Sequence, residues 1–295
     1  MKYKTAAAFR RALEERLRQQ SVGGGQPLTR LRKMVSFDRF LARLAEEEPE
    51  VWIVKGGFAL QLRLGARART TKDIDVSAAN PWTIEETSAH LRAIASRTLG
   101  DWFEFEMGEP AEAATGAPGR GLRFPVHCLL DGRQFENFHL DVGYGDPVLE
   151  PPDLLTAPDI LAFADIAPAR VRCYPLTTQV AEKLHTYTRK YASGETSRAR
   201  DLADILLAAS LERFNSEKLR QAIEATFRAR ASHALPKEMP APPGRISSSY
   251  RQLARDLDLP WPTIVEAAQA AAQFLNPILL DNAHPKWDLT AWRWT

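Results

Sequence analysis

Two aspartates, Asp73 and Asp75, lie one residue apart in the stretch KDIDVS, and their types and spacing suit the binding of a divalent cation. Residues two apart on a strand point to the same face, so the two carboxylates would converge. Their mutual repulsion is costly unless a cation lies between them. Ile74 and Val76 supply the apolar alternation that puts both acids on the polar face. The sequence therefore predicts a site for a divalent metal ion with Asp73 and Asp75 as ligands.

A glycine pair, Gly56 and Gly57, separates the apolar run VWIV from the helix-like stretch FALQLRLG. One interpretation is a tight turn that needs a positive φ. The other is a turn whose missing side chains let backbone N–H groups meet phosphate oxygens. The spacing matches neither a Walker A loop nor the pattern GxGxxG. Together with the paired aspartates, the glycines favour metal-assisted phosphoryl or nucleotidyl transfer.

A third carboxylate, Asp141, stands in HLDVG at the end of a predicted strand. Sites with two metal ions use several carboxylates to hold both the attacking and the leaving oxygen. Asp141 would then complete the metal site or act as general base toward an acceptor hydroxyl. Taken alone, it is equally well explained as an ordinary residue at a strand end.

The elements that must position these residues alternate between helix and strand. Amphipathic patterns predict helices within the first fifty residues, and short β-branched runs predict strands at 51–54 and 73–77. A hairpin is expected around Asp131 and Gly132, because this pair is favoured in tight hairpin turns. Beyond Glu150 the chain passes through a proline-bearing connector and becomes mostly helical. We therefore predict an α+β catalytic lobe at 1–150 and a helical lobe at 151–295.

Composition argues against a strongly basic nucleic-acid-binding protein, a disulfide-stabilised protein and a membrane-spanning protein. The 295 residues include 39 basic and 37 acidic side chains, so any contact with nucleic acid must be a local patch. Two cysteines, Cys128 and Cys173, provide neither a disulfide framework nor metal-ligand spacing. The N-terminus has no apolar signal region, and no window is long and apolar enough to span a membrane. A cytoplasmic protein without a membrane partner is expected.

Four motifs in chain order carry a resemblance to a known family. They are KGGFAL together with RTTKDID, the HLDVG strand, the helix segment VAEKLHTYT, and RARDLADI. This order resembles the nucleotidyltransferase fold shared with DNA polymerase β. More narrowly, it is similar to the AbiEii/MenT toxins of bacterial type IV toxin–antitoxin and abortive-infection systems. Arg200 stands where lysine is common in the last motif, which keeps the positive charge but changes the donor geometry.

The resemblance implies a role for each matched residue. Gly56 and Gly57 would lie under a nucleoside triphosphate, with Lys55 or Arg69 helping to neutralise it. Mg²⁺ or Mn²⁺ would be held by Asp73, Asp75 and Asp141. Lys183 would reach the phosphates, although a surface lysine is its ordinary interpretation. His139 and His185 receive no role.

Arg198, Asp201 and Asp204 recur at three-residue spacing, so one helix can present all three on a shared face. The resemblance makes Asp204 catalytic and Arg198 a nucleotide contact, while Asp201 would touch the nucleotide or brace Lys183 or Arg198. A solvated stripe with a local ion pair is the alternative interpretation.

The resemblance further implies an NTP donor, transfer of NMP to the 3′ end of tRNA, and a cognate antitoxin as partner. Basic side chains concentrate in the N-terminal helices and near the glycine turn, where they could follow an RNA backbone or form solvated helix faces; they are Arg10, Arg11, Arg16, Arg18, Arg30, Arg32, Lys33, Arg63, Arg67 and Arg69. Two other functions stay open: a small-molecule nucleotidyltransferase of the antibiotic-modifying type, and a non-catalytic nucleotide-binding module. A phosphate on Thr70 or Thr71, next to Asp73, would be expected to silence the site.

Overall fold

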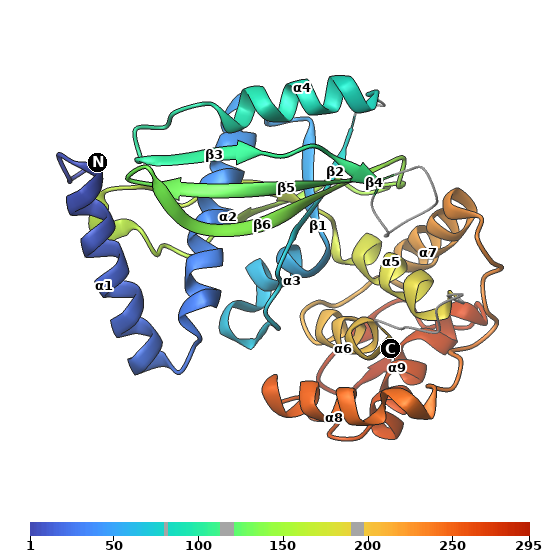
Figure 1. Ribbon diagram of the computed structural model, residues 1–295. Helices are drawn as coiled ribbons and strands as arrows, with labels where there is room; N and C mark the ends of the chain where they lie inside the picture. Colours follow the sequence, from blue (N-terminus) through green and yellow to red (C-terminus); the bar gives the residue numbers. More distant parts are fainter. Residues whose placement is uncertain (80–81, 113–120, 190–197) are drawn as a thin grey trace. The chain divides into compact units, whose positions relative to one another are not determined.

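The computed structural model describes residues 1–79, 82–112, 121–189 and 198–295; the side chains of Ala66 and Arg198 lie outside the described part. The chain forms two compact units. The first unit comprises Met1–Gly65, Thr70–Gly145 and Asp153–Cys173, and the second comprises Ala66–Arg69, Asp146–Pro152 and Tyr174–Thr295. Figure 1 shows the sheet strands β1 to β6 in the first unit and helices α5 to α9 in the second.

A mixed sheet forms the frame of the first unit. In strand order β3-β5-β6-β2-β1-β8-β7, the pairs β2–β6 and β1–β8 are parallel and the other neighbouring pairs are antiparallel. The short strand β4 also pairs with β5. The bounds of the strands are β1 Trp52–Lys55, β2 Ile74–Ala78, β3 Phe103–Met107, β4 Ala111–Glu112, β5 Gly121–Leu130, β6 Arg133–Tyr144, β7 Asp153–Thr156 and β8 Arg170–Cys173.

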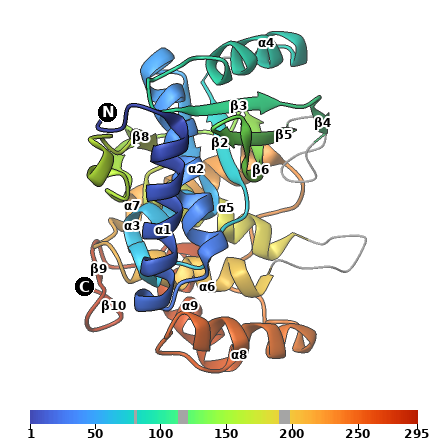
Figure 2. The same cartoon turned by 60° about the vertical axis from the view of Figure 1, so that its left-hand side comes forward.

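Helices pack on this sheet through apolar side chains. Their bounds are α1 Ala6–Gly24, α2 Leu28–Glu47, α3 Gly56–Leu64 and α4 Ile84–Ala95. Figure 2 shows α1 beside α2, and the two helices are in contact. Phe37 of α2 meets Phe58 of α3 and Phe138 of β6 edge to face, with ring centroids 5.1 and 5.0 Å apart. Because aromatic burial contributes strongly to core stability, this cluster fixes α2 and α3 against the sheet.

The hairpin between β5 and β6 turns at Asp131 and Gly132, as the sequence predicts. Both residues have a positive φ, 57° and 62° respectively, as tight hairpin turns with two central residues require. A β-bulge between Cys128 and Leu129 shifts the pairing of the rest of the hairpin by one residue. The bulge decides which β5 residue lies opposite Asp141.

The second unit is mainly helical. Helix α6 contacts α5, α8 and α9, while α7 contacts α5 and α9. Their bounds are α5 Leu176–Thr188, α6 Arg198–Ala209, α7 Ser216–Arg230, α8 Ser247–Asp256 and α9 Ile264–Leu279, followed by the short pair β9 Trp287–Asp288 and β10 Arg293–Trp294. In the described ranges, no helix is both long and apolar enough to cross a membrane.

The α+β class expected from the sequence is confirmed, with a mixed sheet and a helical C-terminal part. The division into units differs from a boundary at residue 150. Asp153–Cys173 belong to the first unit, because β8 pairs in parallel with β1 and β7 pairs with β8. The segment Ala66–Arg69 belongs instead to the second unit. The pairing of β8 with β1 joins segments more than a hundred residues apart, so no local sequence pattern predicts it.

Candidate active site

A row of charged side chains crosses four adjacent strands of the first unit. Lys55 on β1 is paired with Asp75 on β2, Asp75 with Asp141 on β6, and Asp141 with Arg123 on β5. Residues directly opposite each other in a sheet project to the same face. The buried neighbours Ile74 and Leu140 alternate with the two acids and point to the core side. Two carboxylates therefore stand between two cationic residues on one face of the sheet.

Gly56, the first residue of α3, lies directly against this row. Its φ is +65°, a conformation that side-chain-bearing residues adopt reluctantly. A Cβ atom at this position would lie 2.4 Å from Oδ2 of Asp75. The glycine is thus required twice, once for the backbone angle and once for the close approach of the Asp75 carboxylate. Gly57 is buried in the first turn of α3, and a helix N-terminus is a favourable place for phosphate oxygens.

Arg123 is a residue of this row that the sequence did not single out. Its Nε donates to Oδ1 of Asp141 at 2.7 Å and its Nη2 donates to Oδ2 at 2.6 Å. The same Nη2 lies 3.8 Å from Oδ2 of Asp73. Hydrogen bonds to Asp141 raise the pKa of Arg123 above its usual value, so the guanidinium stays charged. One cation thus faces the carboxylates that were predicted to hold a metal ion.

Asp73 lies at the more open end of the site. It directly precedes β2, and its Oδ1 is 3.2 Å from Nδ1 of His139 on β6. The Asp73 side chain is 31% exposed and that of His139 is 47% exposed, whereas Asp141 retains only 7%. A ligand entering from solvent would therefore meet Asp73 and His139 before Asp141.

The donor chemistry of Asp73, Asp75 and Asp141 fits a hard divalent cation, which prefers carboxylate oxygens. In the described part of the chain, we find no three or more His, Cys, Asp or Glu side chains close enough together to hold a metal ion. Both oxygens of Asp141 accept hydrogen bonds from the Arg123 guanidinium. Magnesium is usually bound through one or two carboxylates together with substrate phosphates. The residues present thus fit an ion held by Asp73 and Asp75, and the three-carboxylate site stays a prediction.

A second charged cluster lies in the second unit and joins Lys183, Asp201, Asp204 and Arg69. Nζ of Lys183 is 2.8 Å from Oδ2 of Asp204 and 3.5 Å from Oδ1 of Asp201. Arg69 donates to the other side of the cluster, from Nε to Oδ1 of Asp204 at 3.0 Å and from Nη2 to Oδ2 at 2.9 Å. The short spacing on α6 thus brings Asp201 and Asp204 to the same lysine.

Because the charged groups of Lys183 and Asp204 are buried, the charge state of each depends on its charged neighbours. Burial alone would raise the pKa of Asp204, but the charges of Lys183 and Arg69 outweigh it and lower that pKa to about 2. Burial likewise opposes the charged form of Lys183, and Asp204 and Asp201 together still raise its pKa. The lysine is therefore a fixed, permanently charged ammonium rather than a mobile surface group.

The sequence also singled out Arg198 and Arg200 on α6. The helix begins at Arg198, whose side chain lies outside the described part of the structure. Arg200, which replaces the common lysine, is exposed.

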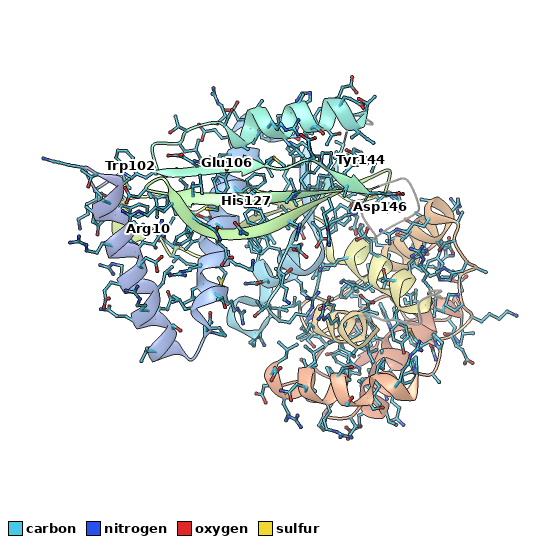
Figure 3. All side chains as sticks on the ribbon, viewed as in Figure 1. Arg10, Trp102, Glu106, His127, Tyr144 and Asp146 are labelled. Carbon is cyan, nitrogen blue, oxygen red and sulfur yellow. The ribbon has the colours of Figure 1, made fainter. Side chains whose placement is uncertain are left out.

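Several basic side chains proposed to hold RNA are engaged within the first unit. Arg10, labelled in Figure 3, donates from α1 to the carbonyls of Leu130, Arg133 and Gln134 at the β5–β6 turn. Arg32 pairs with Glu14 at 2.5 Å, and Nζ of Lys33 donates to the carbonyl of Asn137 at 2.6 Å. These contacts hold α1 and α2 to each other and to the hairpin. Structural roles thus account for part of the basic patch, although Arg11 and Arg18 are exposed.

A family model identifies the chain as a member of a nucleotidyltransferase family. The family model described as nucleotidyl transferase AbiEii toxin, type IV toxin–antitoxin system, matches residues 39–290, so the chain belongs to the AbiEii family. The chain shares its fold with MenT4, a nucleotidyltransferase toxin from Mycobacterium tuberculosis H37Rv, at a TM-score of 0.57 and 17% identity, covering 95% of this chain and 99% of that one.

Two further solved structures are similar at lower scores. One is a proposed nucleotidyltransferase from H. pylori, with a TM-score of 0.45 and 15% identity, covering 85% of this chain and 97% of that one. The other is ANT(2″)-Ia in complex with adenylyl-2″-tobramycin, with a TM-score of 0.38 and 21% identity, covering 68% and 98%. A search of curated proteins gives no match.

Proposed function

We propose that this chain transfers NMP from an NTP to the 3′-hydroxyl of tRNA and thereby blocks translation and growth. The observation that carries the proposal is the row formed by Lys55, Asp75, Asp141 and Arg123, with Asp73 beside it, in a member of a nucleotidyltransferase family. Carboxylates next to a glycine turn and flanked by cations suit a triphosphate and its metal ion better than they suit a neutral ligand.

In this proposal Asp73 and Asp75 hold Mg²⁺ or Mn²⁺. The bound ion would supply Lewis-acid stabilisation of the charge on the phosphates. Gly56 and Gly57 let the backbone approach the triphosphate, and Lys55 adds positive charge on the same face of the sheet. Asp141 is the third carboxylate, as a ligand or as the base that accepts the proton of the acceptor hydroxyl.

The cluster in the second unit is assigned to the nucleotide. Lys183 is the phosphate contact, and Asp204 is its buried partner. Asp201 and Arg69 hold these two groups in position through the contacts described above. Arg198 is retained as a nucleotide contact on the strength of the motif alone. Because Lys183 is fully charged and held by two carboxylates, it would meet the phosphates with little loss of side-chain entropy.

Membership of a type IV toxin–antitoxin family supports a cognate antitoxin as partner. We propose that the chain acts in the cytoplasm, where NTPs and tRNA are both present.

Incubation of the purified protein with Mg²⁺, labelled NTPs and total tRNA tests the acceptor. We expect extension of tRNA that carries a free 3′-hydroxyl, and none of tRNA whose terminal ribose has been oxidised with periodate. Asp73→Asn, with the geometry kept and one charge removed, should abolish extension. Phosphate contacts release counterions, so the affinity for tRNA should fall steeply between about 50 and 200 mM salt. Extension of oxidised tRNA, or none of either, would contradict the assignment.

A small-molecule acceptor is the second candidate, and the engagement of Arg10, Arg32 and Lys33 within the first unit favours it, since hydrogen-bond donors of these side chains are already used within the protein. A panel of hydroxylated aminoglycosides, assayed beside tRNA with the same labelled NTPs, separates the two acceptors. Labelling of a small compound without incorporation into RNA at low salt would select this function. Binding of NTP with transfer to neither acceptor would indicate a non-catalytic module.

A further inference from the structure

Arg123 is the counter-charge to the carboxylates of the candidate active site. Its guanidinium binds both oxygens of Asp141 and lies 3.8 Å from Asp73, and its positive charge also interacts with Asp75. A divalent ion shared among these carboxylates would need the same oxygens of Asp141. Arg123 and the ion would therefore compete for Asp141.

The burial of the two partners is unequal. The Asp141 side chain is 7% exposed, whereas the Arg123 side chain is 38% exposed. A buried carboxylate left without a cation is costly, so Asp141 must hold one positive group or another. Arg123 reaches it with a long, half-exposed side chain, whose rotatable bonds allow movement toward solvent. The pair is therefore suited to an exchange of cations at a fixed carboxylate.

We propose that Arg123 is a positioning residue that occupies Asp141 and lowers the affinity of the site for divalent metal. The ion is then held by Asp73 and Asp75 alone, and Asp141 becomes a ligand or a base only when the guanidinium has moved away. This inference rests on the proposed metal-dependent transfer. It gives Arg123 a role in setting the metal affinity, and the sign of its effect is opposite to that expected for a residue that merely stabilises the fold.

Binding of Mn²⁺, followed by the electron paramagnetic resonance signal of the free ion, measures this affinity without any catalytic turnover. Arg123→Met keeps most of the aliphatic length and removes the charge and the hydrogen bonds. We expect it to bind Mn²⁺ about tenfold more tightly than the wild type, the size expected for the loss of one charge-assisted contact to a ligand. Arg133→Met is the matched control, because it removes one exposed arginine from the same hairpin.

Two further variants separate competition from a general effect of charge. In an Asp141→Asn background, Arg123→Met should tighten Mn²⁺ binding much less than in the wild type, because the contested carboxylate is gone and only the weaker interactions of Arg123 with Asp73 and Asp75 remain. Arg123→Lys keeps the charge but cannot bind both oxygens in the same way, so its affinity should lie between those of the wild type and Arg123→Met. Should Arg123→Met be too unstable for titration, the rise in Tm caused by Mn²⁺ gives the same comparison, and it should be larger for Arg123→Lys than for the wild type.

The outcomes distinguish the inference from the proposed function. Mn²⁺ binding by the wild type that Asp73→Asn removes supports the metal site itself. If that binding is present and Arg123→Met binds equally or more weakly, the role of Arg123 is overturned and the metal site is retained. If neither the wild type nor Arg123→Met binds Mn²⁺, both are overturned. Tightening by Arg133→Met equal to that of Arg123→Met would also overturn the inference, since it would reflect net charge alone.

Discussion

Substitution of Gly56 by alanine should disable the site with only a moderate loss of stability. The added Cβ would lie 2.4 Å from Oδ2 of Asp75, whereas ordinary van der Waals contacts of a Cβ atom begin at 3.4 Å. The Asp75 carboxylate must therefore move away by about 1 Å. A misplacement of ~1 Å at a reacting centre can reduce a rate by roughly 10²-fold. The positive φ adds a backbone cost of about 1–2 kcal/mol to the free energy of unfolding.

Gly65→Ala is the matched control for this substitution. Gly65 follows the other end of α3 and has a φ of +59°, but nothing lies within 4 Å of its added Cβ. Both variants should therefore lose free energy of unfolding, measured by urea denaturation, while only Gly56→Ala loses the rate of nucleotide transfer, measured with labelled NTP under saturating conditions. Equal transfer rates in the two variants would refute the claim that Gly56 exists to admit the Asp75 carboxylate.

Three other perturbations have defined outcomes. Asp204→Ala leaves the Lys183 ammonium buried without its nearest partner and should cost about 3–5 kcal/mol in urea denaturation; a cost below about 1 kcal/mol would show that the cluster is not coupled. Burial, followed by neighbouring positive charges, lowers the pKa of His185 from 6.5 to about 3, so the unfolded chain binds the extra proton between these values and stability should fall as the pH drops below 6.5. His185→Gln should flatten that decline between pH 6.5 and 4.5, and an unchanged slope would exclude His185 as its source. Thr70→Glu should reduce transfer, because it adds negative charge near Asp73 at an exposed position, and Thr70→Gln provides the uncharged control; equal activity of the two would remove the electrostatic explanation.

Burial also changes the choice of variant for testing the function in cells. Lys183 lies between Asp201 and Asp204, so Lys183→Ala would remove the proposed phosphate contact and would also leave two buried carboxylates that repel each other. A loss of toxicity in that variant could reflect unfolding. Asp73 is 31% exposed in its side chain, and Asp73→Asn removes charge without opening the core. It is the cleaner test of growth inhibition in a sensitive bacterium.

The parts of the site that follow local patterns could be predicted from the sequence. The alternation around Asp73 and Asp75 placed both acids on the polar face, and the pair Asp131-Gly132 located the hairpin turn. Three-residue spacing on α6 predicted a shared face for Asp201 and Asp204, which both approach Lys183. Each of these features is encoded within a few residues of the chain.

Arg123 could not be found in this way, because its position depends on the bulge. A regular hairpin turning at Asp131 and Gly132 would place Leu122 opposite Asp141, whereas the bulge between Cys128 and Leu129 shifts the register by one and brings Arg123 there. A shift of one residue exchanges the faces of every side chain beyond it. No local sequence pattern predicts the bulge. Its one-residue shift in register determines whether Asp141 lies opposite Leu122 or Arg123.

The contacts of Arg69 and of the basic helices depend on chain segments that are distant in sequence. Arg69 reaches Asp204 over 135 positions, and Arg10 reaches the hairpin turn over 120 or more. A basic pattern on a helix shows which side chains share a face, but not whether another segment supplies carbonyls to them. The RNA surface proposed from the arginine pattern therefore rests on fewer residues than the sequence suggested.

Transfer of the α-phosphate is the reaction that the site is proposed to perform, and double labelling tests it most directly. An NTP labelled at both the α- and γ-phosphates, incubated with the protein, Mg²⁺ and total tRNA, should place only the α label in RNA and release the γ label as pyrophosphate. Asp73→Asn should do neither, and Gly65→Ala should retain both. Transfer of the γ label to any acceptor, or release of the γ label as inorganic phosphate with no α label in an acceptor, would contradict nucleotidyl transfer at this site.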